Sequence, residues 1–184
     1  LVDDPWRIFL TTDHPNGAPF TSYPHLIRLL MDRSFRNDML STINKEAAAS
    51  STLASLDREY SLYDIAIMTR AAPARSLGLK NRGHLGSGAV ADITVYSNHK
   101  NKEKMFSKPD YVFKDGELIV RNGKIVKVVN GATHTLRPEY DNGIEKSLKR
   151  YFDKYQTISL SNFKIDNDEI VEHGNSKIIV QPCM

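Results

Sequence analysis

Apolar and polar positions first form a recognisable pattern near the start of the chain. Residues 6–11, Trp-Arg-Ile-Phe-Leu-Thr, have the length and the β-forming side chains of one strand. The run stops before Asp13, and residues 14–20 contain two prolines, an asparagine and a glycine, which favour a turn. The pattern therefore places Asp13 at the carboxyl end of a strand.

A helix is predicted directly after this turn, with Ser22 as its cap and Pro24 in its first turn. Its apolar face consists of Leu26, Ile27, Leu30 and Met31. In barrels and open sheets of βα units, catalytic groups lie where a strand leads into a helix, which makes Asp13 a candidate catalytic residue. The simpler interpretation is that Asp13 only begins a turn, as aspartate often does, and its spacing alone favours that interpretation.

The next two segments are predicted to be helical. Residues 34–60 are polar and rich in alanine and serine, so we expect one or two short helices, as a surface excursion or as an active-site lid. Ser61 and Asp64 have the spacing of a capping box, which opens a helix that buries Ile65, Met68 and Ala72. Pro73 should interrupt this helix and start a second short one that ends at Gly78.

From residue 91 the periodicity is close to two, which is typical of strands. A strand is predicted at 91–96. Asp115-Gly116 and Asn122-Gly123 are strong hairpin signals, and they separate three further strands at 111–113, 117–121 and 124–129. Residues 91–137 are therefore expected to form one small antiparallel β unit.

The last third changes character again. Ile144, Leu148, Phe152 and Tyr155 recur at helical spacing among charged residues, which predicts an amphipathic helix over 143–155. Residues 157–165 and 177–180 are predicted to be strands.

Composition narrows the class of protein. The 184 residues are 40% hydrophobic and 26% charged, which suits a globular domain, or a domain with an appendage. No apolar run approaches the ~20 residues that span a bilayer, and Asp3 and Asp4 stand where a signal peptide would be basic, so no membrane partner is expected. The single cysteine, Cys183, excludes an internal disulfide and a cysteine zinc cluster and favours a cytoplasmic setting.

A nucleic-acid partner is not expected, because the net charge is only +3 and the lysines are dispersed; residues 100–104 are expected to be a solvated loop. Residues 83–88, Gly-His-Leu-Gly-Ser-Gly, look at first like a phosphate loop. They lack the Lys-Ser/Thr of a P-loop, and they precede a strand where a dinucleotide-binding loop would follow one. We therefore set the phosphate-loop interpretation aside.

Three segments together resemble the C-terminal third of the amidohydrolase superfamily. They are Ala-Pro-Ala-Arg-Ser-Leu-Gly-Leu at 72–79, Gly-His-Leu-Gly-Ser-Gly-Ala-Val-Ala-Asp-Ile at 83–93 and Asn-Gly-Lys-Ile-Val at 122–126. Two more segments, Thr-Thr-Asp-His-Pro-Asn-Gly-Ala-Pro-Phe at 11–20 and Tyr-Phe-Asp-Lys-Tyr-Gln-Thr-Ile-Ser-Leu at 151–160, narrow the resemblance. They are similar to the family formed by the A component of formylmethanofuran dehydrogenase and the related component of the bacterial formyltransferase/hydrolase complex.

This resemblance implies an α+β fold, made of the last βα unit of a (β/α)8 barrel and a small antiparallel C-terminal β domain with packed helices. The implied domains are 1–80 (the end of the barrel, with strand eight and helices), 81–140 (the β domain) and 141–184 (a family-specific helix and strands). If the chain is such a fragment, its ordered core should be the 91–137 sheet with helices 62–78 and 143–155 against it. Residues 1–20 should then be repacked or held in an intermolecular contact, and the exposed apolar surface should promote self-association.

The resemblance also implies a dinuclear zinc site in the intact parent. The family's ligands are a His-x-His pair, a carboxylated lysine, two further histidines and the aspartate that ends strand eight, and only that aspartate has a counterpart here, Asp13. The sequence has no His-x-His, and its six histidines are expected to be surface or packing residues; they are His14, His25, His84, His99, His134 and His173. Asp13 is thus a predicted catalytic and metal-binding residue of the parent, and no cofactor is expected in this chain alone.

The implied reaction interconverts formate plus methanofuran and formylmethanofuran, with the fragment inactive by itself. Its implied partners are the missing N-terminal part of the same polypeptide and the other subunits of the complex. Two alternatives remain open. The chain could be an assembly or binding module without catalysis, or a piece of another amidohydrolase, such as a dihydroorotase-like hydrolase of cyclic amides.

Overall fold

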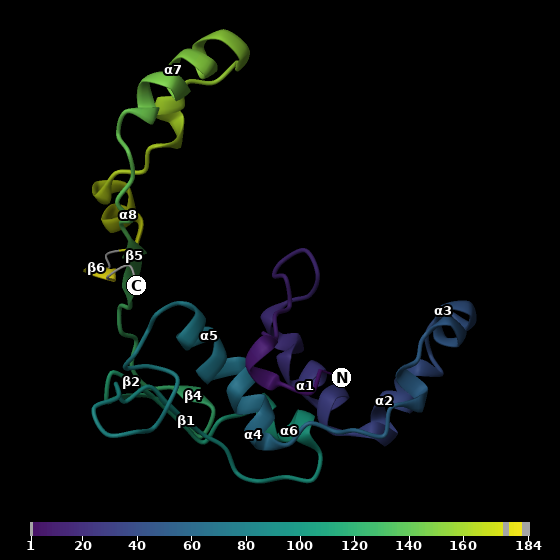
Figure 1. Cartoon of the computed structure of the whole chain (residues 1–184). Coiled ribbons are helices and arrows are strands. Elements are labelled where there is room, and N and C mark those ends of the chain that lie inside the picture. The colour runs from purple at the N-terminus through teal and green to yellow at the C-terminus, as the bar shows by residue number, and fades with distance from the viewer. Residues whose placement is uncertain (1, 175–176, 182–184) are drawn as a thin grey trace. The chain divides into compact units, whose positions relative to one another are not determined.

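The computed structural model describes residues 2–174 and 177–181 (Figure 1). Cys183 lies outside these ranges. The chain forms two compact units that divide between Val128 and Val129. Helices and strands are mixed and the larger sheet is antiparallel, which confirms the expected α+β class. Among the described residues, no helix has the length and apolar character needed to cross a membrane.

The first unit begins with helices and ends with a sheet (Figure 1). Its helical elements are η1 (Pro5–Arg7), η2 (Phe20–Ser22), α1 (Tyr23–Met31), α2 (Arg33–Leu40), α3 (Lys45–Ser50), η3 (Leu53–Ser55), α4 (Leu62–Ala66), η4 (Ile67–Ala71), α5 (Ala72–Ser76) and α6 (Lys102–Ser107). Its strands are β1 (Ile93–Val95), β2 (Tyr111–Lys114), β3 (Glu117–Arg121) and β4 (Lys124–Ile125).

The predicted strand at residues 6–11 is wrong. A 3₁₀ turn, η1, occupies its start, and the Asp4 carboxylate accepts a hydrogen bond from the Trp6 N–H at 3.0 Å. The following residues join neither of the two sheets seen in the described part of the chain. A strand is stabilised by a hydrogen-bonded neighbour. Without one, the segment follows side-chain packing, and Ile8 and Leu10 lie partly buried against the core.

The core of the first unit is helical. Ile27, Tyr60, Ile65 and Met68 are buried together, with Ile8, Leu10, Leu30, Met31 and Phe106 packed around them. These residues come mainly from α1, α4, η4 and α6, and α1 packs along α6. The expected core, a 91–137 sheet covered by helices 62–78 and 143–155, is therefore wrong in two respects. The centre of packing is α1, and helix 143–155 belongs to the second unit.

Local signals predicted the helices between residues 23 and 78. Helix α1 has Pro24 in its first turn, although the Ser22 side chain forms no capping hydrogen bond. Helices α2 and α3 confirm the short helices expected within 34–60. Ser61 and Asp64 form the predicted capping box at α4.

The predicted interruption at Pro73 takes an unexpected form. The chain stays helical from α4 to α5 through a π-helical segment, η4, in which the Ala72 N–H donates to the Ile67 carbonyl. Pro73 then lies in the first turn of α5, where a missing N–H is least costly. Gly78 adopts φ +70° just after α5, as expected of a residue that ends a helix.

The predicted hairpins are confirmed, but β4 ends at Ile125 and not at residue 129 as predicted. Strands β1 to β4 lie in chain order in one antiparallel sheet. Asp115 and Gly116 have φ values of 51° and 82°, and Asn122 and Gly123 have values of 52° and 71°. Positive φ at both central residues is the conformation that two-residue hairpins favour.

The loop expected at residues 100–104 is wrong in part, because α6 begins at Lys102. The Asn101 side chain caps this helix by accepting a hydrogen bond from the Lys104 N–H at 3.1 Å. Packing against α1 adds the tertiary contact that charge composition alone did not reveal.

The second unit consists of β5 (Ala132–Leu136), α7 (Ile144–Tyr155), η5 (Leu160–Phe163), α8 (Asn167–Gly174) and β6 (Lys177–Gln181). Helix α7 and strand β6 confirm predictions, whereas the strand expected at 157–165 is wrong and α8 was not predicted. Residues 132–136 do not extend the antiparallel sheet as expected, because β5 pairs with β6 in parallel. At η5 the Phe163 ring instead packs edge-on against Phe152 of α7, with centroids 5.5 Å apart.

Candidate functional site

The turn around Asp13 is held by backbone hydrogen bonds. The Gly17 N–H donates to the Asp13 carbonyl and the Ala18 N–H donates to the Thr12 carbonyl, both at 2.8 Å. Asp13 has φ +51°, and its N–H donates to the Thr11 hydroxyl at 3.2 Å. Left-handed backbone is uncommon outside glycine and is best tolerated by aspartate and asparagine. The turn therefore fixes the backbone from which the Asp13 side chain projects.

Two neighbours help to shape this turn. Thr12 is only 5% exposed, and its hydroxyl has no hydrogen-bond partner in the described structure. The His14 ring stacks on Phe20 with centroids 4.1 Å apart. The Asp13 side chain itself is exposed, as is His14. The arrangement anchors the backbone and leaves the carboxylate of Asp13 accessible.

Each described histidine outside the turn has a local partner. His25 faces Glu103, with Nδ1 and Oε1 3.5 Å apart, and His84 contacts the Lys80 carbonyl at 3.0 Å. His99 binds the backbone of Asn101, and His134 contacts Gln181. The His173 side chain lies outside the described residues. Across the described ranges, no group of three or more His, Cys, Asp or Glu could hold a metal ion.

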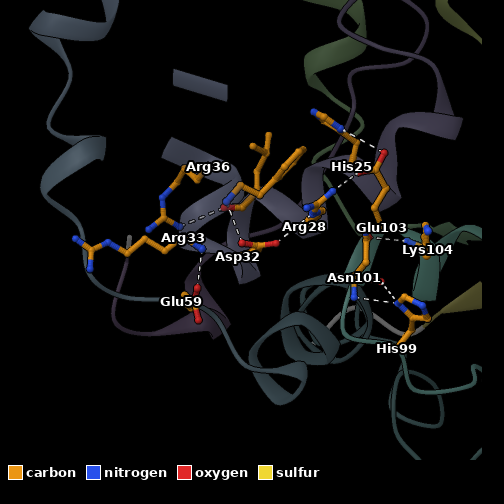
Figure 2. Close-up of polar contacts among 12 residues, drawn as sticks. His25, Arg28, Asp32, Arg33, Arg36, Glu59, His99, Asn101, Glu103 and Lys104 are labelled. Atoms are coloured by element: carbon orange, nitrogen blue, oxygen red, sulfur yellow. Dashed lines mark hydrogen bonds and ion pairs between the residues drawn. The ribbon is translucent and has the colours of Figure 1, made fainter. Parts of the chain in front are cut away.

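A polar network joins α1, the helix after the turn, to α2 and α6 (Figure 2). Arg28 donates through Nε to the Asp32 carboxylate at 3.1 Å and through an Nη to Glu103 at 3.4 Å. Its guanidinium also lies 3.7 Å from the centre of the Phe35 ring. Because Arg28 reaches both neighbours of α1, the network fixes the orientation of the helix that follows Asp13.

Arg36 is the most deeply buried charged side chain of the described residues, at 5% exposure. Its guanidinium donates to three backbone carbonyls, those of Leu29 at 3.2 Å, Leu56 at 2.9 Å and Arg58 at 3.2 Å. Figure 2 shows Arg36 beside Arg33, whose N–H donates to Glu59 at 2.6 Å. Arg36 thus ties the irregular segment 53–60 to the end of α1. No sequence pattern indicated this role.

A cavity of about 370 Å³ lies between α1, η4 and α6. Its walls are mainly apolar and include Leu10, Ile27 and Phe106, with Thr69 and Arg70 as polar members. Asp13 is not among the lining residues. The cavity is therefore an extension of the core packing and not a pocket built around the candidate carboxylate.

The Asp92 carboxylate is the centre of a second charged cluster, beside the first hairpin. It binds Arg82, accepts from Lys114 Nζ at 2.9 Å and accepts from the Asp115 N–H at 2.9 Å. Burial acts to raise the pKa of Asp92, but these hydrogen bonds and the two cations outweigh it and leave the pKa below its ordinary value. The charged groups of this cluster find their hydrogen-bond and ion-pair partners within the cluster. We therefore assign the cluster a structural role.

Comparison with known proteins places the chain in a family. A family model described as the amidohydrolase family matches residues 1–127. The chain therefore belongs to the amidohydrolase family.

Two curated relatives define its position more closely. The chain is 40% identical over 173 residues to the A component of the formyltransferase/hydrolase complex Fhc of Methylorubrum extorquens, covering 94% of this chain and 32% of the relative. It is 37% identical over 187 residues to protein FwdA of Methanocaldococcus jannaschii, covering 95% of this chain and 32% of the relative. The chain spans about a third of the length of the curated relatives it matches. The resemblance to the A component of formylmethanofuran dehydrogenase and its bacterial relative is confirmed.

A solved structure matches over the whole chain. It is the formyltransferase/hydrolase complex FhcABCD of Methylorubrum extorquens in complex with methylofuran. The TM-score is 0.83 at 38% identity, and the match covers 100% of this chain and 34% of the matched chain. The similarity thus extends through both units, including the part beyond residue 127.

Proposed function

We propose that this chain is part of a subunit that interconverts formate plus methanofuran and formylmethanofuran, by forming and hydrolysing a formyl amide. The observation that carries the proposal is the identity of 37–40% over 94–95% of the chain to two relatives of this kind. That match favours formyl-amide chemistry over the hydrolysis of a cyclic amide, as in a dihydroorotase-like enzyme. The setting would be cytoplasmic one-carbon metabolism, including methanogenesis.

Asp13 is the residue we propose for proton transfer. In hydrolysis, water adds to the formyl carbon, Asp13 accepts a proton from that water, and the same proton goes to the amine as the C–N bond breaks. The products are formate and the free amine, and formation of the amide reverses these steps. The exposed carboxylate, held on a backbone with φ +51°, supports this role.

The architecture of the whole protein is also a proposal. Residues 1–80 would be the last βα unit of a (β/α)8 barrel, 81–140 the β domain and 141–184 the family-specific tail. The Ile8 backbone is already extended, with φ −131° and ψ 138°, so this segment could pair with neighbouring strands supplied by the rest of the subunit. On this proposal the chain alone is inactive and self-associates through exposed apolar surface, which light scattering at several concentrations would test.

The described residues of this chain do not fit a dinuclear zinc centre by themselves. Zinc in proteins takes three or four protein ligands, and the described residues hold no group that could bind a metal ion. The proposed zinc site therefore belongs to the whole protein, in which Asp13 would be one ligand among several.

The test replaces Asp13 by asparagine in the full-length subunit within its assembled complex. Asparagine keeps the shape of the turn but cannot accept the proton, so formylmethanofuran hydrolysis should fall by about 10²–10⁴-fold. The matched control is Asp38→Asn, because Asp38 is an aspartate on α2, away from the turn. Equal activity of the Asp13→Asn variant and the wild type would refute the proposed role.

A second candidate function is assembly without catalysis. It is favoured by the second unit, which lies beyond the matched residues 1–127 and carries an amphipathic helix, α7, with exposed apolar residues. Restored hydrolysis on mixing this chain with the missing N-terminal portion would favour the catalytic proposal. Binding of the other subunits without any restored activity would favour the assembly module.

A further inference from the structure

Helix α7 exposes the apolar stripe that an amphipathic helix normally buries. Ile144, Leu148, Tyr151 and Tyr155 recur at intervals of three or four residues and so share one face. They are 51%, 38%, 51% and 62% exposed, respectively. The α7 stripe, as we call these four residues, therefore has no cover within the described part of the second unit.

The helix is held by a neighbouring face. Phe152 is half-buried and packs on Phe163 of η5. The α7 stripe lies next to this contact on the helix surface. Two of its residues, Tyr151 and Tyr155, have ring centroids 5.2 Å apart. Paired tyrosines on a fixed helix present a large apolar area with little side-chain entropy to lose, and tyrosine is enriched where interfaces bind most strongly.

The charges of α7 are unbalanced around the stripe. Both acids of the helix are already engaged, Glu145 with the Tyr140 hydroxyl and Asp153 with Lys149 at 2.6 Å. Arg150 and Lys154 have no carboxylate partner among the residues that the structure describes. At 100° per residue, Lys154 lies about 60° from Tyr151 on the side of the stripe away from Phe152, and Arg150 lies about 100° from Tyr151 on the same side, toward the back of the helix. Lys154 Nζ lies 4.9 Å from the centre of the Tyr155 ring. A surface that covers the stripe would therefore complement it with acidic groups at one edge.

The place of α7 in the chain indicates what kind of partner this is. The amidohydrolase family model ends at residue 127, before the second unit begins. The relatives that match nearly the whole chain, and the solved structure that matches all of it, include a component of a complex. The extension beyond residue 127 is thus shared with a component of a multi-subunit complex.

We propose that the α7 stripe docks another subunit of the complex, in an apolar groove with an acidic rim along the side of Arg150 and Lys154. This inference rests on the proposed membership of a multi-subunit enzyme. It is independent of the chemistry at Asp13.

The test uses the full-length subunit co-expressed with the other subunits of its complex. One variant, Tyr151→Ser with Tyr155→Ser, removes the aromatic rings of the stripe. The other, Arg150→Glu with Lys154→Glu, reverses the charges beside the stripe. Each double variant should weaken assembly at least about tenfold, measured by mass photometry across a dilution series. Assembly of the wild type should also weaken as salt rises. The matched control is Lys146→Ser with Asp153→Ser, on the opposite face of α7 and with no change in net charge, and it should assemble normally.

Circular dichroism of each isolated subunit shows whether α7 still folds. Unchanged assembly of both folded test variants would overturn the proposal. So would equal protection of α7 from hydrogen exchange in the free and the assembled subunit, because the stripe would then be covered by its own chain. A homodimer abolished by the stripe variant, with assembly intact, would assign the face to a second copy. Normal assembly of an inactive Asp13→Asn enzyme separates this test from the proposed function.

Discussion

A Cβ atom on Gly17 would lie 2.6 Å from the carbonyl oxygen of Thr12 and 3.0 Å from the Cβ of Asp13. A Cβ this close to a backbone oxygen is sterically forbidden, so the turn that carries Asp13 can close only around a glycine. The candidate carboxylate thus depends on a neighbour that has no side chain of its own.

Gly17→Ala should therefore open the turn. Forcing a methyl group into a closed site costs about 1–3 kcal/mol, or the turn shifts and moves the carboxylate. Urea unfolding measures the first effect, and formylmethanofuran hydrolysis by the full-length variant measures the second. Gly131→Ala is the control, because no atom lies within 4 Å of the added Cβ. Wild-type stability and activity of Gly17→Ala would contradict the prediction.

Replacement of the buried guanidinium should destabilise the first unit. Arg36→Met removes the donors of three carbonyls, and because a hydrogen bond to a charged group is worth roughly 1.5–3 kcal/mol, we expect a loss of at least about 2 kcal/mol. Arg33→Met is the matched control. Arg33 pairs with the largely exposed Asp57, and such exposed pairs contribute about 0–1 kcal/mol. Equal unfolding midpoints of the two variants would show that the three carbonyls find other donors.

The Asp92 cluster predicts a pH dependence. The pKa of Asp92 in the folded chain is below its ordinary 3.8, so its stabilisation is complete above that value and is lost as the pH falls through the folded pKa. The pKa of Lys114 is raised above 10.5, because its hydrogen bonds to Asp115 and Asp92 outweigh the burial that would lower it. Its contribution is complete below 10.5 and is lost as the pH rises through the folded value.

Asp92→Asn should therefore be less stable than the wild type near neutral pH, and the difference should shrink in strong acid. Thermal unfolding of both proteins from about pH 2 to about pH 7 checks this sign. Asp38→Asn provides the reference, because it makes the same substitution at an exposed position on α2. A difference between Asp92→Asn and the wild type that persists at the acidic end would assign the effect to packing.

Metal analysis tests the division of ligands between this chain and the rest of the subunit. After dialysis against a chelator, the purified chain should hold far less than one zinc per molecule, because zinc needs three or four protein ligands and our proposal assigns only one, Asp13, to this chain. The full-length subunit, treated in the same way, serves as the positive control. About one retained zinc per chain would mean that these residues build a site of their own.

Features encoded within a few residues were predictable from the sequence. The capping box of Ser61 and Asp64 and the hairpin turn at Asp115-Gly116 depend on adjacent side chains and on backbone preferences. Features that need a distant partner were not. The segment at 6–11 has the composition of a strand but finds no neighbour to pair with in the described residues, and β5 pairs with β6 from far along the chain.

The same division holds at the candidate site. The motif around Asp13 indicated a turn and a carboxylate, but the close approach of Gly17 to Thr12 is visible only in three dimensions. No sequence pattern indicated that Arg36 is buried, because an arginine on a short polar helix is normally solvated. The carbonyl groups that Arg36 binds come from two other segments of the chain. The role proposed for Asp13 came from the family resemblance and remains a prediction.

The parallel pairing of β5 with β6 has a consequence for the order of folding. Its register joins Ala132 to Lys177 and Leu136 to Gln181, so the two strands cannot meet until everything between them has been synthesised. Helix α7 can form earlier from local contacts, whereas the strand pair must first overcome the entropy of closing a long loop. A ribosome that stopped before Lys177 would release a chain whose β5 has lost its one partner in that sheet of the described structure, with backbone groups free to pair with other chains.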